Sequence, residues 1–409
     1  MDMNYDVAVI GGGVVGCAVT FELTRHGFSC LLLEKNSTLV SEASAGNSGM
    51  LHCGFDIKES TELQCIQKSQ AHVFDVLNTF SVPLQRIGAT MVAWNDEQLQ
   101  KFPHVVKHAN NVGVEDIQTL SLSDLYQKEP NLNRKALGGL YIPGECVTDP
   151  WLFPMLLMND ARHKGAKIFT DSLLESCHWD DKRWMLYTTQ GLVKSKCIVN
   201  TAGLYGDIVD KLAGKNNFSI HPRKGQFTIY NKSSSHLINS SILPVPSDVG
   251  KGVIVFRSVY DNVIVGPTAD QVERRVRPPI DDNLSHRLST VAMETVPSLL
   301  QYKVDMKYTG LRPATEIKDY VIRSDNDKNW VTVGGIRSTG LSGCLGIAEM
   351  VRDFVQEDIR IEPSRGSCLV LDKPDVKSTT HGTVVIDTTE FTITHPLSMV
   401  GHAGQHSKL

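Results

Sequence analysis

The first thirty-five residues place the strongest limit on how this chain folds. Residues 5–10, YDVAVI, form a short apolar run that is typical of a buried parallel strand. The run enters GGGVVG at residues 11–16, which opens an apolar-periodic helix over 17–26, and a second apolar strand over 30–33 ends at Glu34. The glycine pattern alone is also found in ordinary turns. Strand, turn, helix, strand and acid in this order and spacing predict a dinucleotide-binding βαβ unit.

The residues of this turn have separate functions in such a unit. Gly11 permits the tight turn, Gly13 lets a pyrophosphate approach the backbone, and Gly16 lets the helix pack closely against the strand. The amino end of the helix supplies amides and a positive dipole end to the phosphates. Glu34 is expected to accept hydrogen bonds from ribose hydroxyls, and its alternative is a charge on the surface.

Two further strand-to-glycine turns occur much later in the chain. IVNTAG at 198–203 and WVTVGG at 330–335 are each typical of a buried strand that ends in small residues. The intervening segments contain short, partly alternating strands, as in an antiparallel sheet. We therefore expect an α/β fold, with a discontinuous Rossmann-like domain and an inserted, mainly antiparallel β-sheet substrate domain. Because no second GxGxxG follows, we expect a resident redox cofactor that the substrate itself reduces.

Composition excludes several classes of function. A net charge of −4 and a pI near 6.4 give no electrostatic reason to expect nucleic acid. The nine cysteines form no CxxC pair, which argues against a disulfide framework, a metal site or an iron–sulfur cluster and favours reduced thiols. No apolar stretch is long enough to predict a membrane span, and the first strand begins too early for a cleaved signal peptide.

The last three residues are those of a targeting signal. Ser407, Lys408 and Leu409 form the tripeptide that peroxisomal import receptors read. We expect the preceding residues 401–406 to be flexible enough to expose it. The sequence therefore predicts binding to the peroxisomal import receptor and residence in the peroxisomal matrix.

In their order and spacing, these turns resemble those of the FAD-dependent D-amino-acid-oxidase superfamily. The resemblance covers about residues 5–357, and the chain looks most like the glycerol-3-phosphate dehydrogenase and 2-hydroxyglutarate oxidoreductase branch. It rests on the first turn with Glu34, on AGNSGMLH at 45–52, on NTAG at 200–203, on GLRP at 310–313 and on GIRSTGL at 335–341.

The resemblance implies FAD as the cofactor and assigns segments and residues to it. The FAD-binding domain is expected to comprise 1–82, 144–222 and 306–360, the substrate domain 83–143 and 223–305, and a C-terminal extension with the targeting tail 361–409. The residues implied to contact FAD are Gly11, Gly13, Val14, Val15, Gly16, Glu34, Lys35, Ser44, Asn47, Ser48, Gly49, Ala202, Gly203, Gly335, Gly340 and Leu341. The helix that begins at Gly340 would aim its amino end at the flavin N1–C2=O edge, where amides and the helix dipole stabilise negative charge.

Two residues are candidates for the chemistry of oxidation. His52 follows the flavin loop and suits removal of a hydroxyl proton, because histidine titrates near neutrality; its alternative is a structural hydrogen bond. By resemblance, Arg312 binds a substrate carboxylate or phosphate through its guanidinium fork, and its alternative is a structural salt bridge. Arg257, Arg337 and Lys224 are weaker candidates for a second cation.

Three functions fit these residues. The first is oxidation of a small anionic substrate, a 2-hydroxy acid or a glycerol-3-phosphate-like alcohol, by hydride transfer to flavin N5, with oxygen as the acceptor that a peroxisome favours. The second is an FAD-dependent amine or amino-acid oxidase, in which a neutral amine has less need of a base and His52 is structural. The third is a flavoprotein assembly factor without catalysis. His52 and Arg312 together favour the first.

Overall fold

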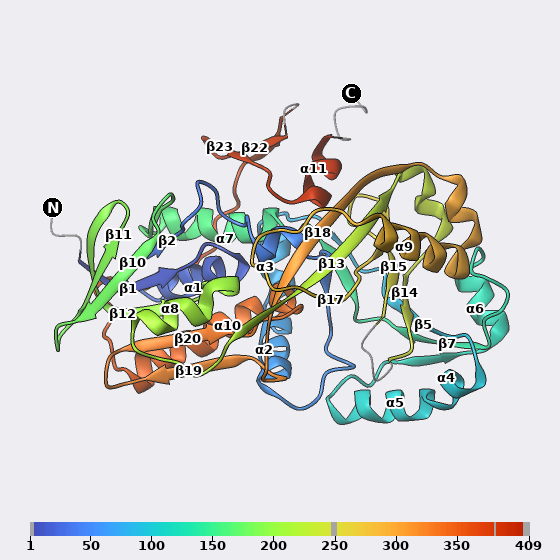
Figure 1. Ribbon diagram of the computed structural model, residues 1–409, viewed down its shortest axis with the longest axis horizontal. Coiled ribbons are helices and arrows are strands. Elements are labelled where there is room, and N and C mark those ends of the chain that lie inside the picture. The colour runs from blue at the N-terminus through green and yellow to red at the C-terminus, as the bar shows by residue number, and fades with distance from the viewer. Residues whose placement is uncertain (1–3, 247–251, 380–381, 404–409) are drawn as a thin grey trace.

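The computed structural model describes residues 4–246, 252–379 and 382–403. Two large sheets lie side by side, the first on the left of Figure 1 and the second on the right. The path through the first sheet is β10-β11-β12-β1-β2-β9, with β20 paired to β12 and β19 paired to β20. Its strands are β1 (Asn4–Ile10), β2 (Cys30–Leu33), β9 (Lys167–Phe169), β10 (Leu174–Trp179), β11 (Trp184–Thr188), β12 (Gly191–Asn200), β19 (Val321–Asp325) and β20 (Trp330–Gly334).

The three strand-to-glycine turns meet at one edge of this sheet. β1 pairs in parallel with β2 and β12, and β12 pairs in parallel with β20. Since parallel strands point the same way, the turns at Gly11, Ala202 and Gly335 follow neighbouring carboxyl ends. The predicted α/β fold, with a Rossmann-like domain assembled from distant segments, is confirmed.

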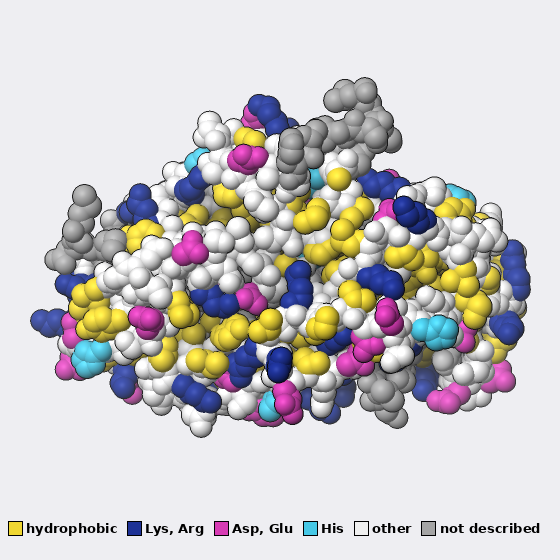
Figure 2. All heavy atoms as spheres, turned by 45° about the horizontal axis from the view of Figure 1, so that its top comes forward, with side chains coloured by type: hydrophobic (Ala, Val, Ile, Leu, Met, Phe, Trp, Pro, Cys, Tyr) yellow, Lys and Arg dark blue, Asp and Glu magenta, His cyan; other side chains and the backbone are white. Residues whose placement is uncertain are grey.

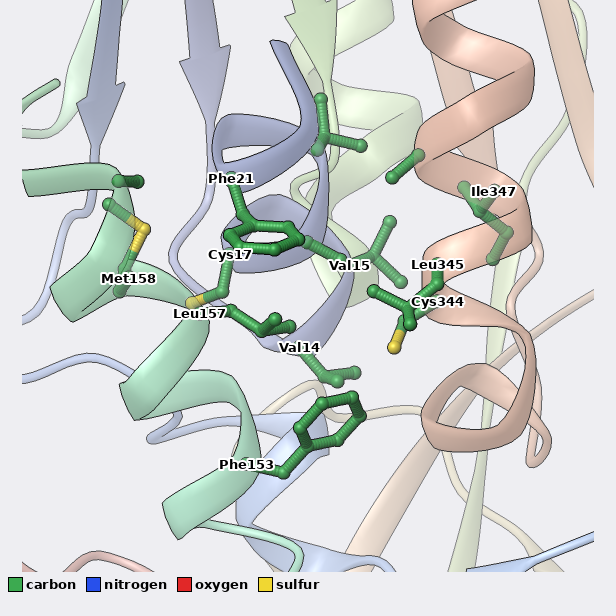
Figure 3. Close-up of a cluster of buried hydrophobic side chains, with 14 of the residues drawn as sticks. Val14, Val15, Cys17, Phe21, Phe153, Leu157, Met158, Cys344, Leu345 and Ile347 are labelled. Carbon is green, nitrogen blue, oxygen red and sulfur yellow. The ribbon is translucent and has the colours of Figure 1, made fainter. Parts of the chain in front are cut away.

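Helices cover the first sheet, and α1 (Val14–Arg25) lies at the centre of their packing. Figure 3 shows apolar side chains of α1 between those of α7 (Leu152–His163) and α10 (Gly340–Asp353). The start of α7 has a clear cause, because Asp149 Oδ1 accepts the backbone N–H groups of Trp151 (2.8 Å) and Leu152 (2.9 Å). The other helices of this domain are α2 (Thr61–Gln70), α3 (Val73–Thr79) and α8 (Gly206–Leu212).

The second sheet has the strand order β17-β13-β16-β15-β14-β5-β7-β6, with β18 on β13. Its pairings are antiparallel except for β14 with β5. Its strands are β5 (Ala89–Ala93), β6 (Gln118–Leu120), β7 (Gly138–Ile142), β13 (Ile220–Tyr230), β14 (Ser241–Pro244), β15 (Ile254–Arg257), β16 (Val263–Gly266), β17 (Asp270–Gln271) and β18 (Val304–Thr315). Its helices are α4 (Asp96–Gln100), α5 (Phe102–Asn111), α6 (Leu122–Lys128) and α9 (Asp282–Thr295). The predicted boundary at residue 306 falls inside β18, because this long strand continues the second sheet before the chain returns to the first.

The C-terminal extension packs on both halves of the molecule. A small sheet of β21 (Val376–Ser378), β22 (Thr383–Ile386) and β23 (Thr389–Thr392) lies near α7, and α11 (Pro396–Ala403) follows it (Figure 1). The expectation of flexibility from residue 401 is wrong for Gly401 and His402, which are buried in α11. The signal at Ser407 to Leu409 lies outside the described residues.

A buried carboxylate joins the extension to both sheets. Asp149 accepts hydrogen bonds from Tyr260 Oη (2.5 Å) and Ser398 Oγ (2.5 Å), and His402 Nε2 lies 3.2 Å from it. Burial alone would raise the pKa of Asp149, but the bonds from His402, Ser398 and Tyr260 outweigh burial and hold the pKa at about 2. The charged carboxylate is thus held between α7, the second sheet and α11.

Charges of both signs are mixed on the face of the molecule that Figure 2 presents, with Lys and Arg side chains interspersed with Asp and Glu. Among the described residues, no helix is long and apolar enough to cross a membrane. The same residues contain no group of three or more His, Cys, Asp or Glu arranged to hold a metal ion.

Candidate active site

A cavity of about 1290 Å³ lies between the two sheets and reaches the three glycine turns. Most residues predicted to bind the cofactor or substrate line it: Gly11, Gly13, Val14, Val15, Glu34, Lys35, Ser44, Asn47, Ser48, His52, Ala202, Gly203, Arg312, Gly335, Arg337, Gly340 and Leu341. Gly16, Gly49 and Arg257 are not on its wall. Segments from four distant parts of the chain therefore meet around one space.

The first turn has the shape that a pyrophosphate needs. Gly11 has a φ of +105°, which favours glycine. A Cβ on Gly13 would meet only Ser44 Oγ, at 3.0 Å, so the space beside this backbone is open. A Cβ on Gly16 would lie 1.9 Å from the carbonyl oxygen of Gly11. Gly16 therefore acts through packing of α1 on the turn rather than through contact with a ligand.

The acid after the second strand is part of the turn. Glu34 is buried and accepts the backbone N–H of Gly12 at 2.7 Å through Oε2, while Oε1 accepts the backbone and side-chain N–H groups of Asn36, both at 2.8 Å. Carboxylate oxygens have further lone pairs, so Glu34 keeps capacity for a ribose hydroxyl. Lys35 is held by Glu42 at 2.5 Å and lies over the ring of Tyr205.

The loop over residues 44–49 folds back against the second sheet. Gly46 lies so close to Gly310 of β18 that a Cβ would come 2.3 Å from the Gly310 Cα. Asn47 Nδ2 donates to the carbonyl of Ser44 (2.8 Å), and Asn47 Oδ1 accepts the N–H of Gly49 (2.7 Å). Gly49, which the resemblance assigns to the cofactor, has a φ of +73° that favours glycine, and a Cβ there would lie 2.8 Å from the carbonyl oxygen of Thr148.

Two helix N-termini point at the cavity. α1 begins after Gly13, and α10 begins at Gly340, which lines the cavity together with Leu341. Unsatisfied N–H groups and the positive dipole end make such termini favourable to negative charge. The open backbone at Gly13, the capacity of Glu34 and these two termini fit a dinucleotide such as FAD.

His52 is paired with a residue that the sequence did not suggest. Its Nδ1 lies 2.8 Å from Glu145 Oε2, and Glu145 Oε1 accepts the backbone N–H of Cys53 at 2.9 Å. The side chain of Glu145 is 1% exposed, whereas that of His52 is 25% exposed on the cavity wall. The pair is close because β8 (Cys146–Thr148), directly after Glu145, is antiparallel to β3 (Met50–Leu51), directly before His52.

The predicted cations differ in where they lie. Arg312 is on the cavity wall, where both Nη atoms donate to the carbonyl of Thr268 at 3.2 Å. Burial, then the neighbouring charge of Arg223, lowers the pKa of Arg312 to about 10. Arg337 also lines the cavity, and its Nη2 forms an ion pair with Glu62 Oε2 at 3.0 Å. Arg337 therefore has a structural partner in addition to its place on the cavity wall.

Two cations that are candidates from the sequence, Arg257 and Lys224, do not line the cavity. Arg257 lies beside Asp261, at 3.7 Å, away from the cavity. Ile254 of the same strand lines the cavity, and alternation along a strand puts residue 257 on the other face. Lys224 is buried behind the wall, where its Nζ donates to the carbonyl of Pro279 at 3.0 Å.

Comparison with known proteins agrees with this geometry. The chain is 31% identical over 363 residues to a glycerol 3-phosphate oxidase of Mycoplasma pneumoniae, covering 86% of this chain and 94% of the relative. It is 29% identical over 355 residues to a glycerol 3-phosphate dehydrogenase of Caloramator mitchellensis, and the match covers 86% of this chain and 74% of that relative. An L-2-hydroxyglutarate dehydrogenase of Caenorhabditis elegans is 26% identical over 252 residues, and the match covers 59% of this chain and 58% of that relative.

Solved structures have the same fold. The dithionite-reduced L-alpha-glycerophosphate oxidase of Mycoplasma pneumoniae with FAD bound superposes with a TM-score of 0.83 at 28% identity, covering 90% of this chain and 99% of that one. The FAD dependent oxidoreductase family profile matches residues 6–354. The chain therefore belongs to the FAD dependent oxidoreductase (DAO) family and is an enzyme that uses FAD as its cofactor.

Proposed function

We propose that this enzyme oxidises a small anionic alcohol, a glycerol-3-phosphate-like substrate or a 2-hydroxy acid. The observation that carries the proposal is the hydrogen bond of His52 Nδ1 to Glu145 on the same cavity wall as Arg312. A proton acceptor and an anion-binding group are thus available around one space. The relatives named for glycerol 3-phosphate and L-2-hydroxyglutarate support both classes of substrate.

The His52–Glu145 pair suits removal of a proton from a hydroxyl group. A carboxylate can only accept, so Nδ1 of His52 carries the hydrogen in this bond, and Nε2 is the ring nitrogen that takes up a proton. The positive charge that forms on the imidazole is stabilised by Glu145, which is buried and fixed by the Cys53 N–H. An amine that reacts as its free base has less need of such a base, so the pair favours an alcohol over an amine.

Arg312 binds and orients the substrate through its anionic group. Its guanidinium is held by the backbone carbonyl of Thr268, so its direction is set before a substrate arrives. When bound, FAD would supply the hydride acceptor, and the N-terminus of α10 on the cavity wall offers backbone amides that favour negative charge. We propose oxygen as the final electron acceptor, which the similarity to the glycerol 3-phosphate oxidase of Mycoplasma pneumoniae supports.

Anaerobic mixing of the FAD-loaded enzyme with glycerol 3-phosphate, 2-hydroxyglutarate and glycine tests this proposal. We expect the two hydroxy substrates to bleach the flavin and glycine to leave it oxidised. His52→Ala is expected to slow flavin reduction about 10²–10⁴-fold with flavin content unchanged. The matched control is His286→Ala, an exposed residue on α9. The proposal would be contradicted if glycine alone bleached the flavin. It would also be contradicted if the His52→Ala variant reduced its flavin at the wild-type rate with saturating substrate.

A further inference from the structure

Two arginine side chains lie next to each other on the cavity wall. Arg223 of β13 and Arg312 of β18 are directly opposite in the antiparallel register. Opposite residues project from the same face of a sheet with their Cβ atoms about 4.5–5.5 Å apart, and both of these line the cavity. Gly225, the next residue of β13 on that face, leaves space for Arg312, since a Cβ there would lie 2.8 Å from Arg312 Nη2. The wall therefore presents two adjacent guanidinium groups.

The two guanidinium groups form no direct ion pair with a carboxylate of the described residues, although the nearby charge of Asp270 raises the pKa of Arg312 and so offsets part of the effect of Arg223. Other arginines, such as Arg275 and Arg352, form ion pairs with carboxylates, but neither Arg223 nor Arg312 has such a pair among the described residues. Within the described ranges, Arg312 donates to the backbone carbonyls of Lys224 and Thr268, at 3.2 to 3.4 Å. Nε of Arg223 is buried and has no hydrogen-bond partner among the described residues. Asp270 makes no direct ion pair with either arginine, so an anion bound between them would satisfy the unused donor and offset the rest of their repulsion.

We propose that Arg223 and Arg312 form a subsite for one doubly charged head group, a phosphate monoester, and that Arg223 sets the preference for this group over a single carboxylate. The inference rests on the proposed function and narrows its substrate class. Two guanidinium forks on adjacent strands converge on one small group, and a tetrahedral dianion offers enough oxygens and charge for both. A carboxylate carries one charge and would leave one cation unmatched.

Calorimetric titration of the FAD-loaded enzyme with sulfate and with methyl sulfate tests the subsite without any turnover. The two probes share their tetrahedral geometry, but sulfate carries two charges and methyl sulfate carries one. We expect Arg223→Gln to weaken sulfate binding about 10–100-fold, as for loss of a charge-assisted hydrogen bond, and to change methyl sulfate binding much less. Arg223→Lys should keep most of the preference for sulfate. Arg274→Gln, on an exposed residue shortly after β17, the strand that pairs with β13, is the matched control.

Anaerobic flavin reduction separates this inference from the proposed function. With glycerol 3-phosphate, Arg223→Gln should raise the Kd and leave the limiting reduction rate unchanged, while the Kd of glycerate stays close to wild type. Equal weakening of sulfate and methyl sulfate, an unchanged Kd, or loss of FAD from the variant would each overturn the subsite. If hydroxy substrates never bleach the wild-type flavin but sulfate binding depends on Arg223, the proposed function fails and the subsite stands.

Discussion

Alanine at two glycines of the first turn should separate cofactor binding from folding. At Gly13 an added Cβ would meet only Ser44 Oγ at 3.0 Å, and the φ of −78° is one that alanine adopts freely. At Gly16 the Cβ would lie 1.9 Å from the carbonyl oxygen of Gly11 and 2.8 Å from Thr201 Oγ1. We expect Gly13→Ala to fold normally and bind FAD weakly, and Gly16→Ala to be unstable with or without FAD.

The size of the Gly13→Ala effect follows from mass action. With FAD at one hundred times its Kd, binding stabilises the folded wild-type enzyme by about 2.7 kcal/mol. If the methyl group occupies pyrophosphate space and raises the Kd about 100-fold, the same FAD concentration stabilises the variant by only about 0.4 kcal/mol. Without FAD the substitution should change the free energy of unfolding by less than about 1 kcal/mol, mainly through the lower entropy of the unfolded chain.

The Gly16→Ala effect has a different origin, because the obstacle is backbone. The carbonyl of Gly11 cannot rotate away like a side chain, so α1 must move from the strand. That movement disturbs its packing against α7 and α10, which Figure 3 shows as interleaved side chains. Overpacking of this kind costs about 1–3 kcal/mol or more. The loss should be present in the enzyme stripped of FAD.

Denaturant unfolding of the wild type and both variants, each with and without added FAD, measures the two effects separately. Tryptophan fluorescence follows unfolding, since Trp151, Trp184 and Trp330 are buried in this half of the molecule. FAD affinity is read independently from quenching of flavin fluorescence. The reasoning is refuted if Gly13→Ala retains wild-type FAD affinity, or if it destabilises the FAD-free enzyme as much as Gly16→Ala does.

Three further predictions test other parts of the molecule. Arg312→Lys keeps the charge but loses the bidentate fork, so we expect substrate binding to weaken by about 1–3 kcal/mol in anaerobic titrations, with FAD content unchanged; loss of FAD would show a cofactor role instead. Burial lowers the pKa of His395 from 6.5 to about 3. Between these two pH values the unfolded chain binds a proton that the folded chain excludes. The contribution of His395 to the free energy of unfolding should therefore fall by about 1.4 kcal/mol for each pH unit below 6.5. His395→Asn should flatten that dependence in urea unfolding at pH 7 and 5, and an unchanged slope would argue against it. We also propose that the enzyme resides in the peroxisomal matrix: deletion of Ser407 to Leu409 should leave a fluorescent fusion in the cytosol with normal flavin content, and a full-length protein that never enters peroxisomes would refute this.

Local patterns were enough to predict the cofactor half of the molecule. A glycine turn after a strand specifies its own geometry, so Gly11 and Gly13 could be placed from neighbouring residues alone. The three turns near residues 11, 202 and 335 could be joined because parallel strands share the direction of their carboxyl ends. Gly49 shows the limit of this reasoning, since a positive φ required by a turn looks the same in sequence as close approach to a ligand.

Partners distant in sequence could not be predicted in this way. Glu145 lies 93 residues after His52, and it reaches the imidazole only because β8 pairs with β3. Both strands are short, and nothing in the sequence near either residue marks the pairing. An acid directly before a strand carries no signal of its own, because most such acids are exposed charges.

The cations on the substrate side show which information the sequence lacks. Lys224 is a candidate from the sequence and Arg223 is not, although the two are adjacent and both are basic. On a strand, adjacent side chains point to opposite faces, and here Arg223 lines the cavity while Lys224 does not. Which one does so depends on the register of β13 against β18, and here Arg223 is opposite Arg312 while Lys224 is opposite Leu311. A shift of one residue would exchange their places. The sequence therefore shows which residues are charged, but not on which face of the strand each one lies. That face is fixed by pairing with a strand more than eighty residues away, and the proposed specificity of the site depends on that pairing.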